Sequence, residues 1–163
     1  MRLLGIALAF LVLSGCWWQD EMVQIQKNGD MTMAIIVMPD WEFTSKEEVQ
    51  SRAASYEDEM RKAGWLINKN TESKANGEFN LHYILKGNLL RVNQQTSFYE
   101  IVSRNSKQVT IRFLTPRIDE ERVDRKLYFD YSIANTATVF DKNKSLVQEV
   151  ETVNEDDRYI ISL

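Results

Sequence analysis

Residues 21–38 read Glu-Met-Val-Gln-Ile-Gln-Lys-Asn-Gly-Asp-Met-Thr-Met-Ala-Ile-Ile-Val-Met, and this stretch sets the expected fold. Asn28-Gly29 separates two alternating runs, whose apolar members are Val23 and Ile25 and then Met31, Met33, Ile35 and Val37. An Asn-Gly pair in this setting favours a type I′ turn, because both central residues of that turn need positive φ. We predict a β-hairpin over residues 21–38, ended by Pro39-Asp40.

One helix is expected next, over Thr44–Ala63. Thr44 with Glu47 forms a capping box, and Ser45 with Glu48 offers the same pair one residue later. A single apolar stripe follows at helical spacing, made of Val49, Ala53, Tyr56, Met60 and Ala63. Gly64 stands where a left-handed residue commonly ends a helix. A narrow stripe of this kind predicts packing across one face of a sheet.

The remaining chain alternates between short apolar runs and turns. Strands are expected at Trp65–Lys69, 78–86, Ser97–Val102, Val109–Leu114, 127–133 (continuing towards Val139), Leu146–Val150 and Tyr159–Leu163. Gly87–Thr96 is expected to be a short helix or an irregular segment, and the charged stretch Thr115–Lys126 a solvated loop or a short helix. The predicted class is therefore α+β, a mainly antiparallel sheet with one long amphipathic helix packed on one face.

The first 16 residues have the character of an export signal. Arg2 precedes an apolar run of 11 residues, Leu3–Leu13. At about 1.5 Å per residue this run is too short to cross a hydrocarbon core of about 30 Å. Leu13-Ser14-Gly15-Cys16 resembles the bacterial lipobox at all four positions. The resemblance implies cleavage before Cys16, a palmitate-type diacyl group on its thiol and an acylated new amine, whereas the alternative is an N-terminal core helix with a buried free thiol.

The expected organisation is a lipoprotein signal peptide at 1–15, a lipidated anchor and short tether at 16–21, and one α+β domain at 22–163. Two or three acyl chains make a stable membrane anchor. Trp17 and Trp18 are expected to rest among lipid head groups or to pack on the domain. Because Trp17 is not the Asp that usually marks inner-membrane retention, the predicted location is the outer membrane, facing the periplasm, although the inner membrane remains an alternative.

Composition narrows the function further. The chain has 20 Lys+Arg and 24 Asp+Glu, so removing Arg2 leaves 19 basic residues against 24 acidic ones and a formal charge of −5. This balance speaks against nucleic acid as a partner. One cysteine cannot form a disulfide within the chain, and His82 is the one histidine, so no metal site and no cofactor are expected. His82 is expected on the strand face opposite the apolar set, half-exposed.

No catalytic residues are predicted. The sequence has no Gly-x-Ser-x-Gly elbow and no glycine-rich phosphate loop, and its adjacent carboxylates lie in cap, loop and turn contexts. Two non-enzymatic functions remain. One is a structural or interaction module of the cell envelope that docks a protein partner, and the other is a carrier that binds a lipid or another apolar ligand between sheet and helix.

The mature chain also resembles the LppM-like lipoproteins. The likeness is carried by the hairpin from Gln24 to Val37, Gly64-Trp65 at the end of the helix, the strand Phe79–Leu85, and Ser132–Val139 followed by Asp141-Lys142-Asn143. The last segment lacks the proline that the family has there. The resemblance implies a non-enzymatic envelope domain and assigns no catalytic residues.

Overall fold

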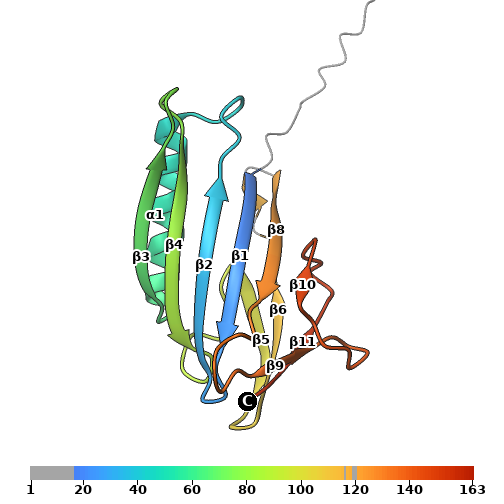
Figure 1. Cartoon of the computed structure of the whole chain (residues 1–163). Coiled ribbons are helices and arrows are strands. Elements are labelled where there is room, and N and C mark those ends of the chain that lie inside the picture. Colours follow the sequence, from blue (N-terminus) through green and yellow to red (C-terminus); the bar gives the residue numbers. More distant parts are fainter. Residues whose placement is uncertain (1–16, 116, 119–120) are drawn as a thin grey trace, which may run out of the picture.

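Two β-sheets account for most of the structure, a computed structural model that describes residues 17–115, 117–118 and 121–163 (Figure 1). Strands make up 49% of the structure and helix makes up 12%. The predicted α+β class is therefore wrong, and the protein is mainly β. The prediction failed because it placed every strand in a single sheet. No helix in the described part of the chain is long and apolar enough to span a bilayer.

The larger sheet has the strand order β10-β8-β1-β2-β4-β3, and β7 pairs with β8. Its strands are β1 (Trp17–Ile25), β2 (Asp30–Met38), β3 (Leu66–Ser73), β4 (Phe79–Asn88), β7 (Arg117–Ile118), β8 (Glu121–Phe129) and β10 (Glu149–Val150). Neighbouring strands are antiparallel except β1 and β8, which run parallel from Trp17↔Val123 to Val23↔Phe129. A parallel pair needs a long crossover, and this one contains β2, β3 and β4, the helix at residues 46–62 and, within residues 99–113, two of the four strands of the second sheet.

The smaller sheet has the order β5-β6-β11-β9 and is antiparallel throughout. Its strands are β5 (Tyr99–Arg104), β6 (Gln108–Phe113), β9 (Thr138–Phe140) and β11 (Tyr159–Ser162). It covers the half of the larger sheet that contains β1 and β8. The aromatic rings of Phe113, Phe129 and Tyr159 meet there, with centroid separations of 5.7 to 6.5 Å.

The predicted hairpin is confirmed as β1 and β2, in register from Trp18↔Met38 to Ile25↔Met31. The expected type I′ turn is wrong, because Gly29 has φ +87° but Asn28 does not have a positive φ; the Gly29 amide donates to the Gln26 carbonyl and the Gln26 amide to the Asp30 carbonyl. Strand β1 starts earlier than predicted, so residues 17–21, expected to form a tether, are the first part of the sheet. Trp17 packs into the domain, at 5% exposure, whereas Trp18 is 46% exposed.

Helix α1 (Lys46–Lys62) is shorter than predicted. The Ser45 side chain caps it by accepting a 3.2 Å hydrogen bond from the Glu48 amide, and Gly64 follows its end with φ +96°. Val49, Ala53, Met60 and Ala63 of the predicted stripe are buried. Because α1 covers only part of the larger sheet, on the side of β3 and β4, the second sheet forms the rest of the opposite layer, and the predicted single long covering helix is wrong (Figure 1).

Two segments differ most from the sequence prediction, and the strand expected at Leu146–Val150 is limited to β10, Glu149–Val150. Thr115–Lys126, expected to be a solvated loop or short helix, contains β7 and the first part of β8. The strand expected over 127–133 ends at Phe129, and β9 is a separate strand in the other sheet. Both differences arise because strands pair with segments that are distant in the sequence. The alternation of apolar and polar residues within one segment does not show which distant segment is its partner.

Candidate functional site

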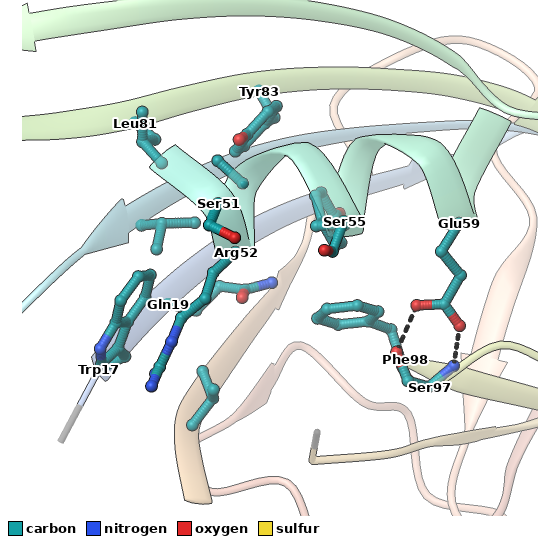
Figure 2. Close-up of a pocket in the computed structure, with 14 residues that line it drawn as sticks. Trp17, Gln19, Ser51, Arg52, Ser55, Glu59, Leu81, Tyr83, Ser97 and Phe98 are labelled. Atoms are coloured by element: carbon teal, nitrogen blue, oxygen red, sulfur yellow. Dashed lines mark hydrogen bonds between the residues drawn. The ribbon is translucent and has the colours of Figure 1, made fainter. Parts of the chain in front are cut away.

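The main candidate site is a cleft of about 290 Å³ at the seam between α1 and the second sheet (Figure 2). Strands from the larger sheet form its floor, α1 forms one wall, and the segment before β5 closes one end. It is lined by Trp17, Gln19, Val37, Ser51, Arg52, Ala53, Ser55, Tyr56, Glu59, Leu81, Tyr83, Ser97, Phe98 and Val123.

The floor consists of inward-facing side chains from neighbouring strands. Gln19, Val37 and Leu81 lie in one row across β1, β2 and β4, and Trp17 with Val123 occupies the next row. Each of these residues is buried, because successive side chains of a strand point to opposite faces and this set faces the interior. The floor is therefore mostly apolar.

The helix wall is lined by small and polar side chains. Ser51, Ser55 and Glu59 recur every four residues and so share one face of α1, which Figure 2 shows along the cleft. Ser51 and Ser55 are exposed, and Ala53 is buried beside them. Short side chains here leave space that larger ones would fill, and this is why a cleft exists at the seam.

Glu59 closes the end of the cleft next to the second sheet. Its carboxylate accepts hydrogen bonds from the Ser97 amide and from the Ser97 hydroxyl, both 2.6 Å long. The neighbouring Phe98 ring contacts Tyr56 edge-on, with 4.5 Å between centroids. These contacts fasten the segment before β5 to the helix.

Trp17 and Arg52 form the opposite end of the cleft. The Arg52 guanidinium carbon lies 5.2 Å from the centroid of the Trp17 ring, a cation–π contact, and Arg52 also donates to the Glu48 carboxylate. The Trp17 Nε1 donor is buried and has no hydrogen-bond acceptor among the described residues. Such a donor calls for an explanation, since buried polar groups are nearly always paired.

The tyrosines in the cleft are neutral at physiological pH. Burial raises the pKa of Tyr56 well above its ordinary value, and the nearby Glu21 carboxylate raises this pKa further. Burial likewise raises the pKa of Tyr83, together with Glu57, whose carboxylate accepts a 3.4 Å hydrogen bond from the Tyr83 hydroxyl. Neither phenol can therefore act as a base here.

A buried ion pair lies between the sheets, next to the floor of the cleft. Arg125 donates from Nε and Nη2 to the two carboxylate oxygens of Glu21, at 2.5 and 2.9 Å. The Arg125 Nη1 donates to the backbone carbonyls of Phe98 and Leu114, which flank the β5–β6 hairpin. Gln19 Nε2 donates to Glu21 at 2.9 Å and so connects the pair to the cleft floor. The pair thus ties both sheets together.

The residues singled out from sequence do not meet at this site. Cys16, the predicted lipidation site, lies outside the described residues. His82 lies on the outer face of β4, as predicted, 3.1 Å from Glu72. Within the described ranges, no three His, Cys, Asp or Glu side chains lie close enough together to hold a metal. The sequence analysis missed Ser51, Ser55 and Glu59 as site residues; their spacing of four beside the apolar stripe was the available signal.

Comparisons with protein families, with curated proteins and with solved structures found no match to this chain. The resemblance to LppM-like lipoproteins therefore stays a prediction. The site has to be interpreted from its own geometry.

Proposed function

We propose that this protein is a lipid-anchored, non-enzymatic protein of the bacterial cell envelope whose cleft binds an apolar ligand. The anchor is the acylated Cys16 of the lipobox-like Leu13-Ser14-Gly15-Cys16. The proposed location is the outer membrane, with the domain in the periplasm. The cleft is the observation that favours ligand binding over other roles in the envelope.

The dimensions and lining of the cleft support a small ligand with an apolar body. Its volume of about 290 Å³ lies just below the roughly 300–1,000 Å³ typical of ligand sites. This space suits part of one acyl chain rather than a whole phospholipid. Val37, Leu81 and Val123 offer an apolar floor, while the unpaired Trp17 Nε1 offers a donor to a ligand oxygen.

The chemistry of the cleft supports binding rather than catalysis. Ser97 is its best-placed hydroxyl, but it donates to Glu59, and no imidazole is near because His82 lies on the opposite face of the sheet. Nucleophilic catalysis needs an activated nucleophile with a base that a third group orients. The Glu59 carboxylate beside Ser97 is too weak a base to activate a serine hydroxyl by itself, and the neutral Tyr56 and Tyr83 do not supply a stronger one.

A large side chain introduced on the helix wall, which fills the cleft, tests the ligand site. We expect Cys16→Ser protein, which carries no anchor, to bind cis-parinaric acid and to co-purify with bacterial acyl lipids detectable by mass spectrometry. Ser55→Trp in this background places an indole in the cleft and is expected to weaken binding by at least about tenfold, equivalent to about 1.4 kcal/mol. Fluorescence titration measures the affinity.

The matched control is Ala54→Trp. Ala54 is exposed on the same helix and does not line the cleft, so this variant should bind like its parent. Equal affinity in both tryptophan variants, or no binding by the parent, would refute the proposed ligand site.

The anchor is tested separately by the intact mass of protein extracted from membranes with detergent. We expect the mass of residues 16–163 plus two or three acyl chains, and release of Cys16→Ser into the soluble fraction. A full-length, unmodified mass would refute the proposed anchoring.

A protein-docking role is the second candidate, and the outer face of the larger sheet favours it. Met22, Ile36, Ile84 and Tyr128 are 37 to 50% exposed there. Met22 pairs with Tyr128, and both lie in the row that includes Ile84. Apolar side chains gathered on one face are typical of interaction surfaces. Recovery of one stoichiometric partner that a Met22→Lys variant loses would support this role.

A further inference from the structure

We propose that the aromatic end of the domain, defined as Trp18, Trp41 and Phe43, rests in the head-group layer of the bilayer that holds the anchor. This inference rests on the proposed acylation of Cys16 and goes beyond it. An anchor fixes one point of the protein, whereas a second contact fixes which end of the domain faces the membrane.

The topology brings the aromatic end to the anchor. Strand β1 starts at Trp17, the residue directly after Cys16, and an extended residue spans at most about 3.6 Å. Strand β2 ends opposite this start, because Met38 pairs with Trp18. The chain then passes through residues 39–45 into α1, and Figure 1 shows this loop at the same end of the molecule as the start of β1. No spacer separates this end from the membrane.

The side chains at this end suit a lipid interface. Trp18 is 46% exposed and Phe43 is 48% exposed. Trp41 packs edge-on against Phe79 of β4, with 4.7 Å between ring centroids, which attaches the loop to the sheet. Trp18 in particular suits the membrane–water boundary, because an indole ring is apolar and its N–H is polar, whereas the Trp41 Nε1 is buried and Trp41 serves to hold the loop on the sheet.

The loop holds Phe43 in place through its own turn. The Asp40 carbonyl accepts a 3.3 Å hydrogen bond from the Phe43 amide, and the Asp40 carboxylate accepts one of 3.1 Å from the Glu42 amide. An aromatic ring presented by an ordered turn loses less conformational entropy on contact than one on a flexible chain.

Charge identifies the kind of lipid. Asp40, Glu42, Glu47 and Glu48 surround the loop and the first turn of α1, against Lys46. Within this loop and the first turn of α1 the excess of acid gives no attraction to an anionic surface, so we expect the apolar and interfacial contacts of Trp18 and Phe43 to carry the association. We therefore expect zwitterionic phosphatidylcholine to suffice and added salt to change little.

A fluorophore at the loop tests the contact. Acylated Glu42→Cys protein is labelled with nitrobenzoxadiazole and placed in phosphatidylcholine vesicles; Cys16 does not react because its thiol is acylated. We expect doxyl-labelled phosphatidylcholine to quench this label strongly and Phe43→Ser in the same protein to reduce the quenching. The control is Leu146→Cys, since Leu146 is 50% exposed and lies beside the second sheet, where Val147 bonds to Val139.

The outcomes separate this inference from the proposed anchor. Equal quenching at both positions, or none at residue 42 in vesicle-bound protein, overturns the membrane contact and leaves the anchor intact. Protein that does not bind vesicles and takes the label at Cys16 overturns the anchor, and this inference with it. Quenching at residue 42 alone supports both.

Discussion

The inner face of the larger sheet is covered in two ways, and the two halves differ in how completely they are filled. Under the second sheet, Phe113, Phe129 and Tyr159 pack ring against ring, and each is at most 6% exposed. Under α1, near the start of β1, Ser51 and Ser55 leave the cleft. Large side chains from two sheets interdigitate, whereas short side chains on one helix do not reach the floor.

The filled half therefore contributes most to stability, and the other half contains the cleft for which we propose ligand binding. The filled half also contains the Glu21–Arg125 pair, whose side chains are 0% and 2% exposed. The cleft tolerates empty volume because the filled half holds the sheets together. The following predictions test this division.

The largest effect is expected at the ion pair. Arg125→Met leaves the Glu21 carboxylate buried without its cation, and we expect the free energy of unfolding to fall by about 3–5 kcal/mol. Urea unfolding of Cys16→Ser protein, followed by tryptophan fluorescence, measures this loss. Adding Glu21→Gln removes the unpaired charge and should restore part of the stability. A loss below about 1 kcal/mol for Arg125→Met would contradict the assigned role.

A smaller effect is expected from paired leucine truncations. Leu127 lies in the filled half, at 0% exposure, and Leu81 lies in the cleft floor, at 3%. Leu127→Ala should cost about 3 kcal/mol because it opens a closed cavity, and Leu81→Ala about 2 kcal/mol or less because its space joins the existing cleft. Urea unfolding of both variants compares them. A larger loss at Leu81 would reverse the comparison.

The smallest effect is a change in pH dependence at Tyr159. Burial, with Asp157 and Asp141 nearby, raises the pKa of Tyr159 to about 12 from its ordinary 10.0. Between these values the unfolded chain loses this proton while the folded protein keeps it, so the free energy of unfolding falls as pH rises. In Tyr159→Phe we expect the free energy of unfolding to fall less steeply with pH above pH 10. Below pH 10 we expect the substitution to leave the pH dependence unchanged. An unchanged slope in alkaline unfolding would contradict this.

Local signals predicted the local structure well. Asn28-Gly29 indicated the hairpin, and Ser45 with Gly64 indicated the limits of α1 to within two residues. Each of these depends on nearby backbone and side chains. The division of the strands between two sheets depends on pairing between distant segments, so no local pattern revealed it.

The ion pair itself explains two of the errors. Residues 17–21 were predicted to belong to the tether after the anchor, yet Gln19 and Glu21 are buried side chains of β1 that face the core. Thr115–Lys126 seemed solvated because it is highly charged, although Val123, Arg125 and Leu127 alternate inward in β8. Each charge is buried because the other neutralises it, and a sequence pattern does not show which distant residue is the partner.

The place of β11 in its sheet has a consequence for how the protein is made. Residues 159–162 lie between β6 and β9, so β9 has no partner strand and β6 has only β5 until this late segment has emerged. Contacts between distant parts of a chain also form slowly. For the exported precursor that we propose, we therefore expect the second sheet to be completed only after the last residues of the chain have crossed the membrane.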